Sequence, residues 1–423
     1  MHRLIVPLAS PEAADADRFG PKAANLARLG HAGLPIPAGF CVDAEAYRIQ
    51  VAALGLEDAA RRVSSEEPGT ARRAALAMKL GLMDQPIVPQ VLGPLLQAWR
   101  ALIEATDALT VVRSSALVED RFGSSFAGQF ESYLGLEGEA DFVTAVRSCW
   151  AALWSTRVLR YMATHDASPA DTAMAILVQP LVSARVAGGG LSRTADGDMV
   201  LNATWGLGSS IAQGEVVPER IVLSCDGAVR SNAAGRKFHR VGCAHGTRGA
   251  PRSLLSEPCL DREQATELGR LLRRTEDVMG MPVEIEWAQD DAGFKLLQAR
   301  PLHLEPARVP DEIWLRHPGL GGQPAGVGWG TGRARVVSCE CELERVAPGD
   351  ILVTKVAGPA LGQVLSLVAG VVAELGGSTS HLASLARERG IPMVLGVLDA
   401  TQLIPDGAQV AVDGVAGVVR WMR

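Results

Sequence analysis

Residues 374–396 read ELGGSTSHLASLARERGIPMVLG, and this stretch places His381 where a glycine-rich turn passes into a helical pattern. Apolar residues recur at helical spacing after the histidine, with polar residues on the opposite face. Thr379 or Ser380 is a suitable N-cap, and Gly390 is a suitable stop before an Ile-Pro pair. The pattern therefore predicts a short helix with His381 in its first turn.

A histidine in the first turn of a helix lies where unpaired N–H groups and the helix dipole stabilise negative charge. A phosphate carried on the imidazole of His381 would be held there like other anions at helix N-termini. Gly376 and Gly377 leave room for another backbone or a nucleotide to approach. The local pattern alone also suits an ordinary capping turn with a surface histidine, so both interpretations stay open at this point.

The composition is that of a soluble globular protein: 423 residues, 48% hydrophobic and 21% charged, with a formal net charge of −6. No block of basic residues is present, which disfavours a nucleic-acid partner. The first twenty residues contain no apolar stretch of signal-peptide length, and the longest apolar runs are too short to span a bilayer. We expect a cytoplasmic protein with no membrane association.

The seven cysteines are scattered, and only Cys339 and Cys341 lie near each other. An odd number without C-x-x-C spacing is typical of reduced thiols. We expect neither a disulfide framework nor a zinc site.

A change in composition near residues 299–330, rich in proline and glycine, predicts a linker. We place an N-terminal domain at residues 1–305, a linker at 306–325 and a small α/β domain at 326–423. The N-terminal part is too long for one core, so we expect two lobes.

Two strand-like runs, VEIEWAQ and FKLLQA, are separated by DDAG, which is a hairpin signal. Strand alternation puts Glu284 and Glu286 on one face and Gln298 and Arg300 on one face of the partner. Two carboxylates on an otherwise apolar strand are costly to bury unless a metal ion or cations compensate them.

The motif GGSTSHLASLARERGIPMVLGV resembles the phosphohistidine signature of the phosphoenolpyruvate-utilising enzyme family, which includes phosphoenolpyruvate synthase, pyruvate phosphate dikinase and rifampicin phosphotransferase. The resemblance implies that His381 carries phosphate and that Ala386 and Arg387 are the family's Ala-Arg pair. Gly358 and Leu361 stand where the family usually carries an aspartate and a tryptophan. That departure concerns contacts to the phosphate acceptor.

Four further motifs resemble the ATP-binding domain of the same family, an ATP-grasp-like unit: GPKAANLARLG, VVRSSALVEDRFGSSFAGQF, ILVQPLV and EIEWAQDDAGFKLLQARP. They imply an ATP site at Lys22, Arg113, Gln179, Glu286, Gln298 and Arg300. They also imply a phosphate loop at residues 124–129 and a Mg²⁺ ion held by Glu286 and Gln298. The family usually has an apolar pair in the loop at residues 187–198, where this chain has glycines.

These residue types suit the implied chemistry. Arg113 offers a planar bidentate guanidinium and Lys22 a point charge, so each can serve a different phosphate of ATP. Carboxylate and amide oxygens are hard ligands of the kind Mg²⁺ prefers. Taken singly, Lys22 also suits a solvated helix position, Arg113 a structural ion pair, and Glu286 with Arg300 a cross-strand salt bridge.

The expected fold is α/β (α+β): a two-lobed ATP-grasp-like domain followed by a small swivelling β/β/α phosphohistidine domain. The expected function is that of an ATP-dependent dikinase-type phosphotransferase. It would move the β-phosphate of ATP to His381, release AMP, and pass the phosphate to a small-molecule acceptor or to one held by a separate protein. Two alternatives stay open: an ATP-dependent ligase or condensing enzyme of secondary metabolism, and a regulatory phosphocarrier.

Overall fold

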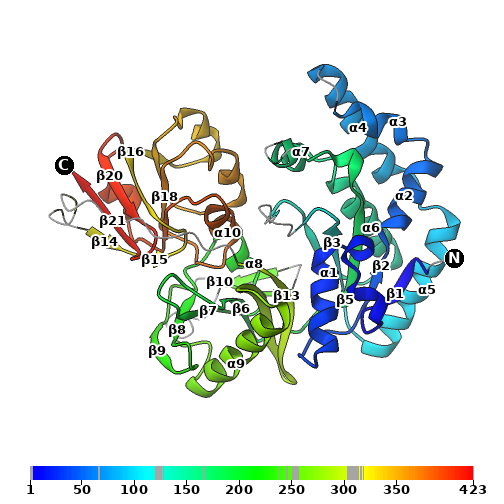
Figure 1. Ribbon diagram of the computed structural model, residues 1–423, viewed down its shortest axis with the longest axis horizontal. Coiled ribbons are helices and arrows are strands. Elements are labelled where there is room, and N and C mark those ends of the chain that lie inside the picture. Colours follow the sequence, from blue (N-terminus) through cyan, green and yellow to red (C-terminus); the bar gives the residue numbers. More distant parts are fainter. Residues whose placement is uncertain are drawn as a thin grey trace. The chain divides into compact units, whose positions relative to one another are not determined.

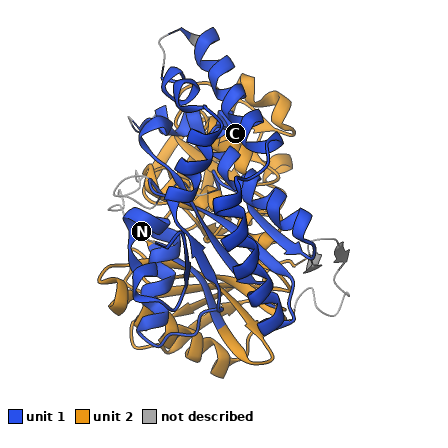
Figure 2. Cartoon of the chain, turned by 90° about the vertical axis from the view of Figure 1, so that its right-hand side faces the viewer, with its two compact units in different colours: residues 1–182, 243–245, 295–300 blue, residues 183–242, 246–294, 301–423 orange. Residues whose placement is uncertain are grey.

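The computed structural model describes residues 3–422, apart from residues 65–66, 120–125, 127, 164, 166, 238, 244–245, 250–256, 303–313, 315–316 and 318. The chain divides into two compact units (Figure 2). The first contains residues 1–182, 243–245 and 295–300. The second contains residues 183–242, 246–294 and 301–423. The mixed α/β fold expected from the sequence is confirmed.

The first unit is built on a five-stranded sheet in the order β1-β2-β5-β3-β4 (Figure 1). Its strands are β1 (Ile5–Pro7), β2 (Phe40–Val42), β3 (Thr110–Ala116), β4 (Ser132–Leu136) and β5 (Met174–Pro180). Neighbouring strands are antiparallel throughout. The central strand β5 is buried almost from end to end, which agrees with its continuous apolar run.

Helices cover both faces of this sheet. Its helical elements are η1 (Pro11–Ala14), α1 (Ala16–His31), α2 (Ala44–Ala53), α3 (Glu57–Arg62), α4 (Pro68–Asp84), α5 (Pro89–Thr106), α6 (Glu139–Ala152), α7 (Thr156–Ala163) and η2 (Pro169–Asp171). On one face, the backbone N–H of Ala23 in α1 donates to the Ser115 hydroxyl of β3. On the other, Trp99 of α5 donates to Thr110 of β3 and stacks on Phe142 of α6.

The second unit begins with a six-stranded sheet in the order β13-β12-β6-β7-β8-β9. The strands are β6 (Val186–Leu191), β7 (Met199–Trp205), β8 (Glu219–Leu223), β9 (Val229–Ala233), β12 (Val283–Asp290) and β13 (Gly293–Pro301). The expected hairpin is present, and residues 295–300 of β13 group with the first unit. A short helix α8 (Ser209–Ala212) and a separate pair, β10 (His239–Cys243) and β11 (Gly246–Gly249), complete this region.

Helix α9 (Arg262–Met279) covers one face of the six-stranded sheet (Figure 1). It starts with a capping box between Asp261 and Gln264 and ends at Gly280, which has a left-handed backbone with φ of 70°. A Cβ on Gly190 of β6 would point toward Leu272 of α9. The neighbouring Gly189 therefore faces the opposite side of the sheet.

The C-terminal part of this unit contains an eight-stranded sheet in the order β14-β21-β20-β16-β17-β18-β19-β15. The strands are β14 (Gly319–Gly321), β15 (Gln323–Pro324), β16 (Trp329–Val337), β17 (Ile351–Thr354), β18 (Gly370–Ala373), β19 (Met393–Leu395), β20 (Gln409–Asp413) and β21 (Val418–Met422). The helical elements are η5 (Glu340–Arg345), η6 (Pro359–Gln363), α10 (His381–Glu388) and α11 (Ala400–Leu403). Strands β16 to β19 run parallel, and valines and isoleucines from them form the core.

Two local features stand apart from the regular elements of this part. The segment Pro359–Gln363 is a short 3₁₀ helix, η6, because a proline and a glycine within it limit regular α-helix. Most of the predicted linker lies outside the described residues, and its end, residues 319–324, forms β14 and β15 of the eight-stranded sheet.

The expectation of reduced thiols is wrong for one pair, because Cys339 and Cys341 form a disulfide. Their Cα atoms are 5.4 Å apart, within the range that a disulfide requires, even though only one residue separates them. Cys41, Cys149, Cys225 and Cys259 have free thiols. Among the described helices, none is both long and apolar enough to cross a bilayer.

Candidate functional site

A kink in α1 positions Lys22 against the first sheet. Gly20 has a φ of 74°, and a Cβ there would lie 2.3 Å from the carbonyl oxygen of Ser115, so only glycine permits this close approach. The Lys22 Nζ donates to the carbonyl of Ser114 at 2.8 Å and pairs with Glu119 Oε2 at 3.2 Å. Lys22 is thus a nearly buried, ion-paired lysine, and the alternative of a solvated helix residue is wrong.

Glu119 is a site residue that the sequence interpretation missed, although it lies in the quoted VVRSSALVED motif. Burial raises the pKa of its carboxyl above the ordinary value of 4.5, while the charges of Lys22 and Arg300 act in the opposite direction. Arg300 therefore lies close enough to Glu119 to act on its charge. The fold brings Lys22, Glu119 and Arg300 together in the first unit.

Residues 295–300 of β13 are attached to α1 and to the loop that follows it. The Asn25 amide donates to the carbonyl of Ala299 at 3.3 Å, and the N–H of Leu296 donates to Pro35 at 2.8 Å. Gln298 and Arg300 are both nearly buried here. Two of the predicted ATP residues thus share the unit that holds Lys22.

Arg113 and Gln179 lie on one face of the five-stranded sheet. Gln179 is directly opposite Val111 in the register of β3 and β5, and Arg113 follows Val111 by two residues. This is the face that α1 covers through Ser115. The Gln179 amide donates to the carbonyl of Pro37 at 3.2 Å. The predicted phosphate loop, residues 124–129, lies largely outside the described residues.

In the second unit, β12 presents Glu284 and Glu286 on the face opposite α9. Glu284 is buried and accepts hydrogen bonds from the Ser384 hydroxyl at 2.8 Å and from Arg387 Nη2 at 2.9 Å. Glu286 is less buried and lies directly opposite Gly189 in β6. The expectation that cations compensate this carboxylate face is confirmed for Glu284.

The cation that compensates Glu284 comes from the histidine helix, α10. Ser380 is its N-cap, accepting from the N–H of Ala383 at 3.3 Å, and His381 is its first residue. Gly390 has a left-handed backbone with φ of 64° just past the helix end, as predicted. Arg387 also donates from Nη1 to the carbonyls of Ala325, at 3.0 Å, and Ser378.

The turn before His381 is held directly on the six-stranded sheet. The hydroxyls of Ser378 and Thr379 donate to Asn202 Oδ1 at 2.8 and 3.1 Å. A Cβ on Gly189 would lie 2.6 Å from the Cβ of Thr379, closer than real side chains approach. Gly189, one of the glycines of residues 187–198 that depart from the family pattern, therefore makes room for the histidine turn.

One face of this sheet thus carries Glu286 and also receives the turn that leads into His381. Arg236 adds an anchor, because its guanidinium donates to the carbonyls of Glu374 and Gly396 at 2.9 and 3.3 Å. A phosphate donor bound on this face would meet an imidazole at a helix start, where negative charge is stabilised. Glu284 lies in the quoted EIEWAQ motif, whereas Asn202, which also creates this arrangement, lies in no motif that the sequence analysis singled out.

The donor set suits a magnesium ion that is held mostly by phosphates and water. Among the described residues, no cluster of three or more histidine, cysteine or acidic side chains is positioned to hold a metal ion. The two ligands predicted from the sequence, Glu286 and Gln298, would contribute one carboxylate oxygen and one amide oxygen. Mg²⁺ commonly binds through one or two such groups and completes its octahedron with nucleotide phosphates and water.

Comparison with known proteins identifies two regions. The family model described as "Pyruvate phosphate dikinase, AMP/ATP-binding domain" matches residues 16–314. The model described as "PEP-utilising enzyme, mobile domain" matches residues 346–417. The match boundaries enclose all the residues that the sequence predicted for the site.

Individual proteins are similar in sequence to most of this chain. A phosphoenolpyruvate synthase of Aeropyrum pernix is 31% identical over 464 residues, covering 95% of this chain and 56% of the relative. A phosphoenolpyruvate synthase of Pyrococcus furiosus is 29% identical, covering 96% of this chain and 57% of the relative. Among solved structures, Enzyme I is 30% identical over 18% of this chain and 31% of that chain, with a TM-score of 0.17. The chain spans about half the length of the curated relatives it matches.

Proposed function

The chain belongs to the family defined by the pyruvate phosphate dikinase AMP/ATP-binding domain, and we propose that it is an ATP-dependent dikinase-type phosphotransferase. In this proposal the β-phosphate of ATP moves to His381, AMP is released, and the phosphate then passes to an acceptor. The observation that carries the proposal is the packing of the His381 turn on the sheet face that presents Glu286.

Each group in the two units has a task in this scheme. Arg113, Lys22 and Arg300 bind the phosphates of ATP, with Arg113 suited to bidentate contact. Gln179 lies on the same sheet face as Arg113 and serves the adenine side. Glu119 keeps the ammonium of Lys22 in place through the 3.2 Å ion pair.

The transfer itself forms a P–N bond between one imidazole nitrogen of His381 and the β-phosphorus. The P–O bond between that phosphorus and the α-phosphate breaks, and its electron pair leaves with AMP. The γ-phosphate departs as inorganic phosphate, with one water consumed. The attacking nitrogen must carry no proton, and the helix start then stabilises the anionic phosphate on it. When bound at Glu286 and Gln298, Mg²⁺ would neutralise charge on the transferring phosphates.

The acceptor is a small molecule or a group presented by a separate protein. To deliver phosphate, the histidine domain leaves the sheet that it contacts through Asn202 and Glu284. These contacts are either all made or all broken. The histidine domain is therefore expected to move between two separate positions and not through a continuous range.

The test uses ATP labelled on its β-phosphate, with Mg²⁺, and measures AMP and acid-labile phosphoprotein. The wild-type chain is expected to acquire acid-labile label, because phosphoramidates hydrolyse in acid whereas phosphoserine survives. His381→Ala should lose this label while binding ATP within a few-fold of wild type. His31→Ala, at an exposed histidine of α1, is the control. Full acid-labile label on His381→Ala would rule out His381 as the carrier.

A further inference from the structure

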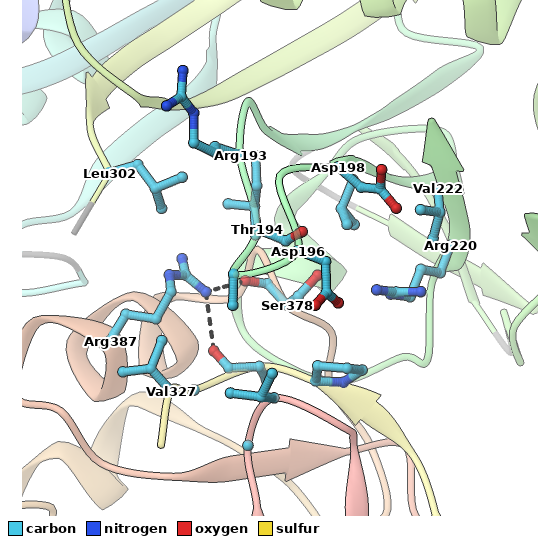
Figure 3. Close-up of a pocket in the computed structure, with 18 residues that line it drawn as sticks. Arg193, Thr194, Asp196, Asp198, Arg220, Val222, Leu302, Val327, Ser378 and Arg387 are labelled. Atoms are coloured by element: carbon cyan, nitrogen blue, oxygen red, sulfur yellow. Dashed lines mark hydrogen bonds between the residues drawn. The ribbon is translucent and has the colours of Figure 1, made fainter. Parts of the chain in front are cut away.

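A pocket of about 100 Å³ opens within the second unit, on the sheet face that also carries Asn202 and Glu284 (Figure 3). Strands β6, β7 and β8 and the loop between β6 and β7 form one side. Residues 324–327 and Ser378 of the C-terminal part form the other. Ser378 of the histidine turn lines the pocket, whereas His381 does not. The pocket is therefore separate from the side chain that is proposed to carry phosphate.

Three arginines line this pocket, and two of them are neutralised. Arg193 pairs with Glu276 at 2.7 Å, and Arg387 pairs with Glu284 at 2.9 Å. In both pairs, a carboxylate from the same unit neutralises the charge of the guanidinium. The third arginine, Arg220 of β8, has no such partner within the part of the chain that the structure describes.

Arg220 points into the pocket from the strand (Figure 3). Its Nε is buried and makes no hydrogen bond to any described residue. Burial lowers the pKa of its guanidinium, and no carboxylate among the described residues acts against that effect. A partly buried cation without a counter-charge is unfavourable, so an anion in the pocket would relieve this cost.

Two aspartates also line the pocket, and neither neutralises Arg220. Asp198 pairs with Arg230 at 2.9 Å. Asp196 is exposed on the turn between β6 and β7. The charge that remains available inside the pocket is therefore the guanidinium of Arg220, with the negative charge of Asp196 at the rim.

We propose that this pocket binds a small oxyanion, a phosphate or carboxylate group, through the guanidinium of Arg220. Arginine forms paired, charge-assisted hydrogen bonds to both kinds of group. The volume admits a group of a few heavy atoms, since a cavity of about 150 Å³ holds a benzene molecule. Because the walls come from both the sheet and the C-terminal part, the bound anion holds the histidine turn on the sheet.

The test is calorimetric titration of the full chain with inorganic phosphate and, separately, with malonate, at constant ionic strength. We expect saturable binding of at least one of them. Arg220→Met should weaken that binding by at least about tenfold, because it removes a charge-assisted contact. Asp196→Asn should tighten it several-fold, because it removes the negative charge at the rim.

The matched control is Arg185→Met, at an exposed arginine outside the pocket that pairs with Asp291. It should leave the affinity unchanged. Binding at the nucleotide site would respond to neither Arg220→Met nor Asp196→Asn, so unchanged affinity in both variants overturns the proposal. The proposal is also overturned if neither anion shows saturable binding to the wild-type chain up to about 50 mM. Binding weaker than that would not be specific. Arg220→Met removes a partly buried charge, so circular dichroism is used to check that the variant is folded.

Discussion

Glu284 of β12 and Arg387 of α10 form a buried ion pair, 103 residues apart in the sequence, with 2.9 Å between Oε2 and Nη2. Both side chains are at most 6% exposed. Ser384 donates to the same carboxylate, and Arg387 also holds the carbonyls of Ala325 and Ser378. The pair therefore joins the helix that starts at His381 to the sheet that carries Glu286.

Arg387→Met should destabilise the second unit by about 3–5 kcal/mol, because it leaves the buried carboxylate of Glu284 uncompensated. Urea unfolding measures this loss. The double variant Glu284→Gln with Arg387→Met should lose less than the sum of the two single variants. Arg345→Met, which breaks partly exposed pairs with Glu342 and Asp406, should cost about 1 kcal/mol or less. If the loss in the double variant equals the sum of the two single losses, Glu284 and Arg387 do not stabilise each other.

Gly189→Ala should weaken the attachment of the histidine turn by about 1–3 kcal/mol, because the new methyl group would overlap Thr379. Hydrogen exchange of the backbone at residues 378–388 should speed up accordingly. Gly208→Ala is the control, since its Cβ would meet its nearest neighbour at 3.6 Å. With Thr379→Gly the overlap is gone, so the double variant Gly189→Ala with Thr379→Gly should exchange no faster than Thr379→Gly alone. Unchanged exchange in Gly189→Ala would contradict the contact.

Glu286→Ala and Arg300→Ala should each slow the phosphorylation of His381 by about 10²–10³-fold, because they remove groups that offset charge on the transferring phosphates. Single-turnover labelling at varied Mg²⁺ concentration measures the effect. Lys295→Ala, on the opposite face of β13 from Arg300, should retain the wild-type rate. Wild-type rates in both variants would mean that these residues form a structural salt bridge and that ATP binds elsewhere.

Glu119 should make the stability of the first unit depend on pH. Its pKa is raised in the folded state, so the folded chain binds a proton that the unfolded chain releases. Stability should therefore fall as pH rises from the ordinary value of 4.5 through the raised pKa. Glu119→Gln should flatten this part of the profile, as measured by urea unfolding at a series of pH values. An identical slope in the variant would show that burial does not perturb this carboxyl.

The histidine domain should occupy at least two positions, with ATP favouring the one in which the His381 turn lies near the phosphates. A ligand shifts such a balance only through contacts that differ between the states. Fluorophores at the exposed positions 263 in α9 and 403 in α11 report the distance. Two populations that redistribute with a non-hydrolysable ATP analogue are expected. A single distribution that the analogue leaves unchanged would contradict a swivelling mechanism.

Much of the site could be predicted because its residues lie in local motifs. The cap at Ser380, the stop at Gly390 and the first-turn position of His381 follow from hydrogen bonding within a few residues. The kink that positions Lys22 likewise lies in one short glycine-proline motif. Strand alternation correctly placed Glu284 and Glu286 on one face. Such features depend on neighbouring residues, which the sequence displays directly.

The sequence by itself thus determined the mixed α/β class, the helix that begins at His381 and the residue types of an ATP site. Only the tertiary structure decided which charges meet: Glu284 with Arg387, Glu119 with Lys22, and Asn202 with the turn before the histidine. It also joined Cys339 to Cys341 and showed why Gly189 lacks a side chain. These relationships depend on the close approach of segments that lie far apart in the sequence, up to 190 residues for Gly189 and Thr379 (379 − 189). The order of residues along the chain does not state which distant segments will meet.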